Sequence, residues 1–168
     1  PSPADMIARF SRLGVENGAQ VVIYDSDSGM FAARLWWMLR FMGHEGAAVL
    51  DGGFARWIAE GRPVTSGRSK WTPTTFRGLA RQSWRLGVDE VVAGLGDQGR
   101  LLVDARANDR YRGLNETIDK VGGHIPGAVN VFFAEIAPKG RFLPHAELRE
   151  RLGDEPFVAY CGSGITAC

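Results

Sequence analysis

Alternation of short apolar runs with helical segments is the feature that most constrains the fold of this chain. Residues 20–25 contain an unbroken β-branched run, which fits a parallel strand buried on both faces. A strongly apolar helix is expected over 30–42, a second strand over 46–50 and a short helix over 54–60. Strands and helices in this order predict parallel β-α units, so we expect an α/β fold.

The second half of the chain repeats this order. Its expected elements are a helix over 88–95, a strand over 100–104, a helix over 144–152 and a strand over 157–160. Between the halves, residues 62–85 are dominated by Pro, Ser, Thr and Gly. Their apolar residues follow neither the spacing of a helix nor that of a strand, which is typical of a linker. We therefore expect two domains, 1–62 and 86–168, joined by a linker over 63–85.

The charge and the cysteine content narrow the function classes. Twenty Lys and Arg residues against nineteen Asp and Glu leave a net charge of +1, which gives no electrostatic footprint for nucleic acid or an anionic membrane. No apolar run reaches the roughly 18 residues of a membrane span. The two cysteines form neither a disulfide framework nor a metal site, so we expect a reducing, cytoplasmic location, no metal and no cofactor.

A thiol follows the last expected strand. Cys161 comes directly after 157–160, and glycines stand at 162 and 164. Two glycines this close let the backbone curl and turn successive N–H groups inward, which favours an anion. A thiol in such a nest has a pKa below its ordinary value and is a nucleophile at neutral pH. The alternative is a buried free cysteine beside a flexible turn.

A faint internal repeat assigns different roles to the two halves. Residues 22–29 resemble 158–164, and the first copy has Asp25 or Asp27 where the second has Cys161. A carboxylate cannot act as a sulfur nucleophile. The first half is therefore expected to be an inactive copy, and the second half is expected to carry the chemistry.

The ordered set of motifs resembles the tandem-domain rhodanese-like sulfurtransferases. Residues 36–57 resemble the end of that family's non-catalytic N-terminal domain. The segments that resemble its catalytic domain are 103–106, 110–113, 123–128 and 161–167. The resemblance implies two rhodanese-like α/β domains with central parallel sheets, both incomplete in this chain. The first strands of one domain and the elements after the loop of the other are expected to be missing.

The resemblance also implies a mechanism. Cys161 attacks the outer sulfur of a small-molecule donor, holds it as a persulfide and passes it to a thiol or cyanide acceptor. A thioredoxin-like reductant is a further candidate partner. The loop stabilises the negative charge of the persulfide and of the leaving group. The loop residues implied in this role are Gly162, Ser163, Gly164, Ile165 and Thr166.

Three residues outside the loop are implied as donor contacts. Arg110 matches the family arginine that binds the anionic donor, and a guanidinium suits a carboxylate or a sulfonate. The alternative role of Arg110 is a surface salt bridge with Asp109 or Glu116. Lys120 would substitute, as a point charge, for a second arginine of the mercaptopyruvate enzymes. Phe31 would form part of the wall of the active-site cleft.

The two residues after the cysteine bear on the choice of donor. Thiosulfate enzymes of the family carry basic residues there, which match a dianion, whereas this chain has Gly162 and Ser163. The loop therefore resembles the 3-mercaptopyruvate type, in which the Ser163 hydroxyl hydrogen-bonds the donor or relays a proton. Residues 117–120 depart from that type because they include no second arginine. Thiosulfate remains the alternative donor.

Other interpretations of the same residues stay open. A cysteine phosphatase would need an arginine six positions after its cysteine, where this chain has Ala167. A non-catalytic rhodanese-like module that binds a partner or senses redox state would also be compatible with the loop.

His124 is expected to pack within its loop, and Asp104 to organise the neighbouring loop and Arg106. Cys168 is expected to be a small buried hydrophobe, with a resolving thiol as the alternative.

Overall fold

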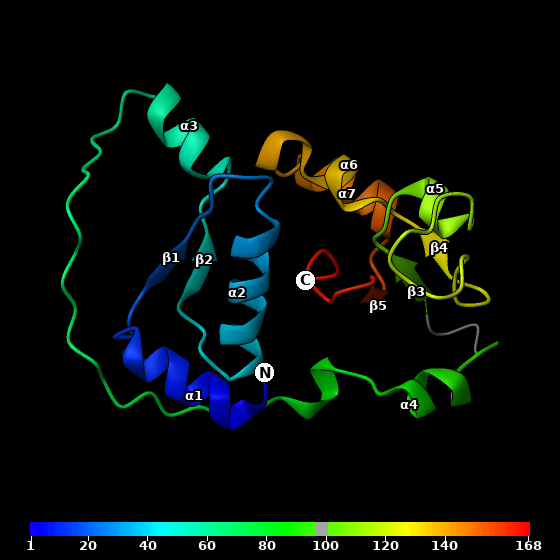
Figure 1. Cartoon of the computed structure of the whole chain (residues 1–168), viewed down its shortest axis with the longest axis horizontal. Helices are drawn as coiled ribbons and strands as arrows, with labels where there is room; N and C mark the ends of the chain where they lie inside the picture. The colour runs from blue at the N-terminus through cyan, green and yellow to red at the C-terminus, as the bar shows by residue number, and fades with distance from the viewer. Residues whose placement is uncertain (97–100) are drawn as a thin grey trace.

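The structure, a computed structural model, describes residues 1–96 and 101–168 (Figure 1). The elements of the N-terminal half are α1 (Pro3–Arg12), β1 (Val21–Ile23), α2 (Met30–Phe41), β2 (Ala47–Val49) and α3 (Gly53–Ala59). Those of the remainder are η1 (Gln82–Trp84), α4 (Val88–Ala93), β3 (Leu101–Asp104), α5 (Asn108–Tyr111), β4 (Val129–Asn130), α6 (Phe133–Ile136), η2 (Pro138–Gly140), α7 (His145–Leu152) and β5 (Phe157–Tyr160). The expected strand 100–104 corresponds to β3, except that Arg100 lies outside the described residues.

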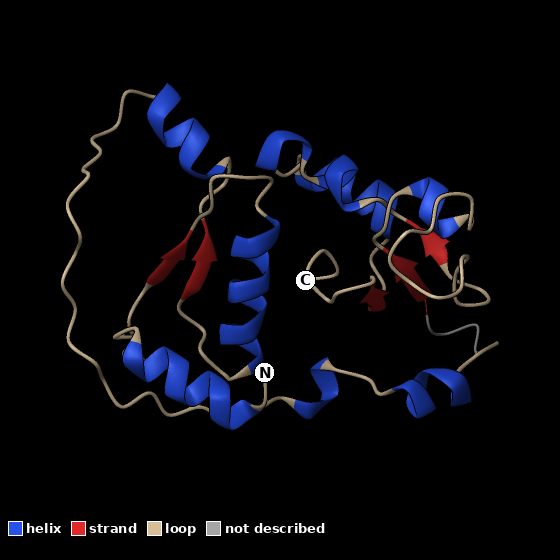
Figure 2. Cartoon of the chain, in the orientation of Figure 1, coloured by secondary structure: helices blue, strands red, loops and turns tan. Residues whose placement is uncertain are grey.

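Each half holds its own parallel sheet (Figure 2). β1 pairs with β2, with Val21 opposite Ala47. The second sheet has the order β4-β3-β5, with Leu101 of β3 opposite Phe157 of β5. Parallel neighbours need a crossover connection, which α2 supplies between β1 and β2. The predicted α/β class with parallel sheets is confirmed.

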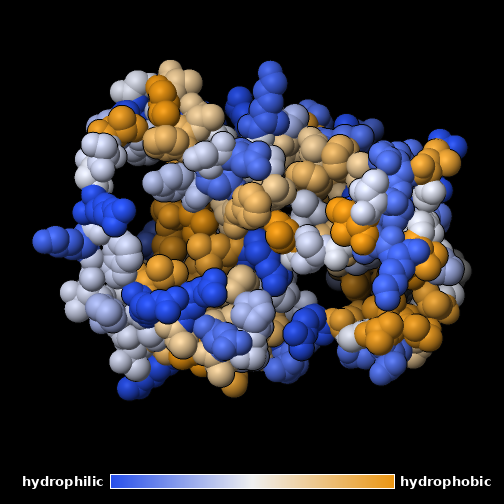
Figure 3. Space-filling view, in the orientation of Figure 1, coloured by the Kyte–Doolittle hydropathy of each residue, from blue (hydrophilic) through white to orange (hydrophobic). Residues whose placement is uncertain are grey.

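The N-terminal sheet is more exposed than its sequence predicts. α2 packs against both of its strands, yet Val22 of β1 is 56% exposed and the following Tyr24 is 57% exposed. Figure 3 shows hydrophobic side chains gathered in the hollow beside this sheet. The prediction that residues 20–25 are buried on both faces is therefore wrong for this chain, because α2 covers one face and none of the described elements buries Val22 on the other.

The larger hydrophobic core lies in the N-terminal half. Its most buried side chains are Phe10 of α1, Leu39 and Phe41 of α2, Met42 and Phe76. The rings of Phe10 and Phe76 meet edge to face, with their centroids 5.2 Å apart, which is a favoured aromatic geometry. The core thus joins the first helix, the second helix and a residue far along the chain.

Phe76 belongs to the expected linker, which runs along α1. The backbone N–H of Thr74 donates to the Ser11 carbonyl at 2.9 Å, and that of Phe76 donates to Ser11 Oγ at 3.0 Å. The N–H of Arg77 donates to Asn17 Oδ1 at 2.8 Å. This segment of the expected linker therefore packs against the N-terminal half, and Phe76 is only 2% exposed.

The two halves touch at the end of β2 and again at the end of the chain. The Gly52 N–H donates to the Gly140 carbonyl at 3.0 Å, and the Phe142 N–H donates to Asp51 Oδ1 at 2.9 Å. Figure 1 shows the C-terminal loop between α2 and the second sheet. That loop is the segment that carries Cys161. In the described ranges, no helix is both long and apolar enough to cross a membrane.

Candidate active site

Cys161 stands at the carboxyl end of β5, an outer strand that pairs with β3. Parallel strands present their carboxyl ends at one edge of the sheet, where ligands of open α/β sheets bind. The thiol is half-buried, and the Gly164 N–H donates to Cys161 Sγ at 3.0 Å. Gly164 has φ +69°, a left-handed conformation that favours glycine.

The surroundings of the thiol favour its ionised form. Burial by itself raises the pKa of Cys161. A hydrogen bond from the Thr166 side chain acts against this effect, as do backbone N–H groups of Ser163, Ala167 and Thr166. The balance places the pKa of Cys161 below its ordinary value. The predicted anion nest is therefore present in the geometry.

The predicted loop residues differ in how they reach the sulfur. Thr166 contributes both its side chain and its backbone N–H, whereas Ser163 contributes its backbone N–H. The Ser163 hydroxyl is exposed and makes no hydrogen bond within the described residues. Gly162 is also exposed, while Ile165 is half-buried and its carbonyl accepts from the Cys168 N–H at 3.3 Å.

Arg110 lies directly beside the loop. A Cβ atom added to Gly162 would stand 3.3 Å from Arg110 Nη2 and 3.7 Å from Nη1. Arg110 Nε and Nη2 also donate to the two carboxylate oxygens of Glu116, at 3.1 and 2.9 Å. Nη2 donates in addition to Asp119 Oδ2 at 2.9 Å. Across the described part of the chain, Nη1 has no hydrogen-bond partner. The predicted proximity to the thiol loop and the alternative pairing with Glu116 therefore both occur.

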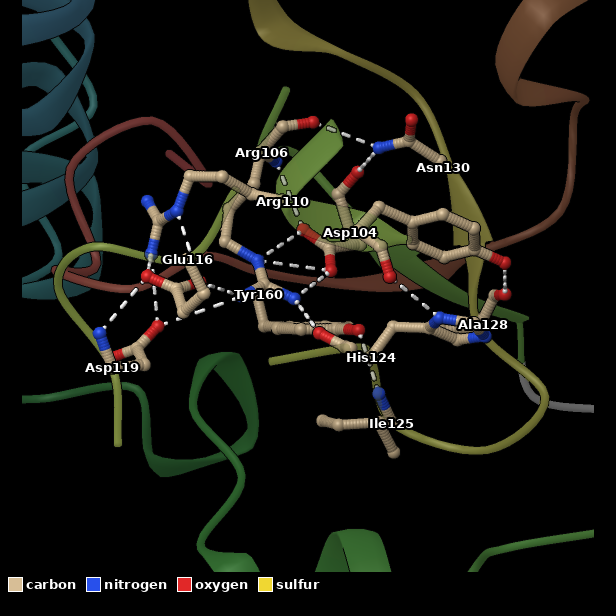
Figure 4. A network of polar contacts seen from close by, with 12 residues as sticks. Asp104, Arg106, Arg110, Glu116, Asp119, His124, Ile125, Ala128, Asn130 and Tyr160 are labelled. Atoms are coloured by element: carbon tan, nitrogen blue, oxygen red, sulfur yellow. Dashed lines mark hydrogen bonds and ion pairs between the residues drawn. The ribbon is translucent and has the colours of Figure 1, made fainter. Parts of the chain in front are cut away.

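Arg106 and Asp104 form the buried base of this network (Figure 4). Asp104 is fully buried, and its Oδ2 accepts from Arg106 Nη2 at 2.6 Å. Arg106 also donates to the Gly123 carbonyl at 2.6 Å and to Glu116 Oε2 at 3.3 Å. The prediction that Asp104 organises Arg106 and the neighbouring loop is confirmed.

The ionisable groups of the network influence one another. Burial raises the pKa of Asp104, but its hydrogen bonds with Arg106 bring it below the usual range. The backbone N–H of Asp119, the Arg110 guanidinium and the Ile118 N–H lower the pKa of Glu116 to about 2. Burial, together with Asp104, raises the pKa of Tyr160 to about 12. At neutral pH these carboxyl groups are therefore ionised and the phenol is neutral.

The network carries more negative than positive charge despite its two arginines. Arg106 and Arg110 supply two positive charges, and Asp104, Glu116 and Asp119 supply three negative ones. With all five groups ionised, the net charge is −1. The neighbourhood of the thiol loop is thus less cationic than the presence of Arg110 alone predicts.

Cys161 lines two cavities. The smaller, of about 350 Å³, also has Arg106, Asp119 and His124 in its wall. The larger, of about 750 Å³, lies between the halves and has Arg34 of α2 in its wall. A thiol between two cavities can meet one reactant on each side.

The wall of the larger cavity includes residues that the sequence did not indicate as part of the site. Arg34 and Trp37 of α2 line it, and so does Trp84 of η1. Arg34 Nη1 donates to Cys168 Sγ at 3.3 Å, and the Cys168 thiol donates to the Gly164 carbonyl at 3.3 Å. A signal was available, since Arg34 lies in a mostly apolar helix three residues before Trp37, and residues three apart share one helix face.

The remaining predicted residues have different surroundings. Phe31 is 50% exposed on α2 and lies outside the walls of both cavities at Cys161. Lys120 is exposed and lies outside them too, so both roles stay predictions. His124 stacks on Tyr111 with ring centroids 3.8 Å apart, and its Nδ1 hydrogen-bonds the Tyr111 carbonyl at 2.8 Å. Packing of His124 within its loop is therefore confirmed.

Cys168 is half-buried and hydrogen-bonded, so it is more polar in its surroundings than the expected small hydrophobe. Burial raises the pKa of its thiol. Both cysteines are free. Among the described residues, no group of three or more His, Cys, Asp or Glu side chains could hold a metal ion.

A family model and the relatives of known name agree on one protein family for this chain. The family model "Rhodanese-like domain" matches residues 2–60 and 87–168. The chain is 42% identical to a probable 3-mercaptopyruvate sulfurtransferase of Pseudomonas aeruginosa, covering 100% of this chain and 62% of that protein. It is 38% identical to the thiosulfate sulfurtransferase of Rattus norvegicus, covering 100% and 61%.

A solved structure agrees with these relatives. The crystal structure of the 3-mercaptopyruvate sulfotransferase SseA from Escherichia coli superposes with a TM-score of 0.87 at 29% identity, covering 99% of this chain and 65% of that one. The chain spans about 60% of the length of the curated relatives it matches. Because the family model accounts for most of its residues in both halves, the chain belongs to the rhodanese-like domain family.

Proposed function

We propose that this protein is a sulfurtransferase that moves a sulfur atom from 3-mercaptopyruvate to a thiol or cyanide acceptor through a persulfide on Cys161. The observation that carries the proposal is the hydrogen bonding of the Cys161 thiol, which lowers its pKa despite partial burial. Relatives named as sulfurtransferases support the reaction class.

The first half-reaction forms the persulfide. The Cys161 thiolate attacks the sulfur of 3-mercaptopyruvate, an S–S bond forms and the C–S bond of the donor breaks. The electron pair of that bond stays on the carbon and gives the enolate of pyruvate, which takes up a proton. The exposed Ser163 hydroxyl, which makes no hydrogen bond in the described part of the chain, can relay this proton. In the second half-reaction the acceptor thiolate, or cyanide, attacks the outer sulfur and Cys161 leaves as a thiolate.

The loop and Arg110 stabilise two different negative charges, that of the sulfur and that of the donor carboxylate. The N–H groups that hydrogen-bond Cys161 Sγ also suit the negative sulfur of a persulfide. Arg110 Nη1 would lie 3.7 Å from a Cβ atom added to Gly162, so this nitrogen is close enough to the loop to bind the donor carboxylate. Lys120 and Phe31 remain candidate donor contacts.

Two further parts of the proposal concern partners and location. A thioredoxin-like reductant is a suitable thiol acceptor, since its reactive thiolate can attack the outer sulfur. We place the protein in the cytoplasm, where the two free cysteines of the structure would stay reduced. Thiosulfate is the second candidate donor, favoured by the similarity to the rat thiosulfate sulfurtransferase.

Mass spectrometry of the protein after incubation with 3-mercaptopyruvate tests the proposal. The expected result is the gain of one sulfur atom on the peptide that contains Cys161, and its loss when cyanide is added. Cys168→Ala should still gain the sulfur, while Cys161→Ser should not. A wild-type protein that gains no sulfur from either 3-mercaptopyruvate or thiosulfate would contradict the assignment and favour a non-catalytic binding or redox-sensing module.

A further inference from the structure

Asp119 occupies an unexpected place for an anion-binding site. Its side chain is 40% exposed and lines the same 350 Å³ cavity as Cys161. Its Oδ2 accepts from Arg110 Nη2 at 2.9 Å and lies 3.5 Å from Arg106 Nη1. A Cβ atom added to Gly162 would stand 3.5 Å from the same oxygen. A carboxylate therefore lies beside the candidate donor arginine, at the same glycine of the loop.

Asp119 is also the most replaceable of the three carboxylates. Asp104 is fully buried and Glu116 is 5% exposed in its side chain, and each makes several hydrogen bonds that hold the loops together. Among the described residues, the side chain of Asp119 makes hydrogen bonds and ion pairs only with the two guanidiniums. Its charge can therefore be changed with little effect on packing.

We propose that Asp119 determines donor specificity, by cancelling part of the positive charge of Arg110 and so selecting against dianionic donors. This inference rests on the proposed sulfurtransferase function and narrows its substrate class to monoanionic donors such as 3-mercaptopyruvate. Asp119 turns a pair of guanidiniums with two carboxylates, which would be neutral, into a cluster with a net charge of −1.

The selectivity follows from the charge dependence of electrostatic energy. Coulomb energy is proportional to the charge of the donor, so Asp119 opposes a dianion twice as strongly as a monoanion. If removal of the Asp119 charge raises the rate constant for a monoanionic reactant by a given factor, it raises the rate constant for a dianionic reactant by the square of that factor. The ratio of the dianion rate constant to the monoanion rate constant then rises by the factor itself. For one partly exposed charge we expect a factor of about threefold to tenfold.

Alkylation of Cys161 tests the inference without any sulfur transfer. Iodoacetate carries one negative charge and iodoacetamide none, and both react by thiolate attack on carbon with loss of iodide. The ratio of their rates cancels changes in thiol nucleophilicity. Peptide-resolved mass spectrometry separates Cys161 from Cys168. In Asp119→Asn the iodoacetate to iodoacetamide ratio at Cys161 should rise by the same factor of about threefold to tenfold.

Matched variants give the controls. Asp119→Glu keeps the charge and should keep the wild-type ratio. Asp154→Asn removes an exposed carboxylate that pairs with Arg149, outside both cavities at Cys161, and should leave the ratio unchanged. The increase in Asp119→Asn should shrink in 1 M salt, where the Debye length is about 3 Å. If circular dichroism shows that Asp119→Asn is misfolded, Asp119→Ser removes the same charge.

The donor comparison completes the test. In Asp119→Asn the ratio of kcat/KM for thiosulfate to that for 3-mercaptopyruvate should rise by the factor measured with the alkylating agents. An unchanged alkylation ratio in the folded variant would overturn the inference, whether or not sulfur is transferred. A wild-type protein inactive with both donors would instead overturn the proposed function, and the alkylation ratio would still report on Asp119.

Discussion

At the scale of single residues, the reactivity of Cys161 depends on a balance between burial and hydrogen bonding. Partial burial disfavours the thiolate, because a charge loses solvation when it leaves water. The Thr166 side chain and the loop N–H groups compensate for this loss. Since the net effect is a lowered pKa, removal of one donor should be visible in the chemistry of the thiol.

Thr166→Val removes the hydroxyl at nearly constant volume. The pKa of Cys161 should rise, so the midpoint of its pH-dependent alkylation by iodoacetamide should move to higher pH. At pH 7 the rate should fall roughly threefold to tenfold, the equivalent of one hydrogen bond. Ser163→Ala is the matched control, because the Ser163 hydroxyl makes no hydrogen bond in the described ranges. A midpoint that shifts equally in both variants would contradict the assigned role of Thr166.

At the scale of elements, local features could be predicted from the sequence and long-range ones could not. The strand before Cys161 and the Gly-x-Gly turn depend on residues that are neighbours in the sequence. The order of residue types along 157–164 was therefore sufficient to predict both. The exposure of Val22 depends on what covers the sheet, and the position of Asp119 depends on how 116–119 folds onto Arg110. The contact of Arg34 with Cys168 joins residues 134 positions apart. No periodicity encodes such contacts.

Phe76 attaches the irregular segment 63–85 to the N-terminal core. Phe76→Ala should lower the free energy of unfolding by about 3 to 5 kcal/mol, since it leaves a cavity beside Phe10 in the N-terminal core. Val64→Ala, in the same linker but at a side chain that is 61% exposed, should change it by less than about 0.5 kcal/mol. Denaturant titration measures both values. Equal effects of the two substitutions would show that the linker does not contribute to the core.

At the scale of the whole molecule, the site depends on how the two halves meet. Cys161 lies in the C-terminal half, whereas Arg34 of the same cavity comes from α2. The halves are joined at Gly140, whose carbonyl accepts from the Gly52 N–H. Gly140 also stands close to the backbone of residues 27–28. A change at this contact should therefore affect the cavity beside the thiol.

Gly140→Ala tests that dependence, with Gly61→Ala as its matched control. Both glycines have positive φ, +72° and +68°, so an alanine at either site costs about 1 to 2 kcal/mol of stability. At Gly140 the new Cβ would also stand 3.2 Å from the Asp27 carbonyl oxygen, whereas at Gly61 no atom lies within 4 Å. Only Gly140→Ala should loosen the contact between the halves.

The thiol of Cys168 reports on this loosening, because it accepts a hydrogen bond from Arg34 across the two halves. Its rate of alkylation by iodoacetamide should rise severalfold in Gly140→Ala and should stay at the wild-type value in Gly61→Ala. Denaturant titration should show the larger loss of stability for Gly140→Ala. Equal alkylation rates in the two variants would mean that the backbone strain alone accounts for the effect, and that the contact at Gly140 does not control the cavity shared by the two halves.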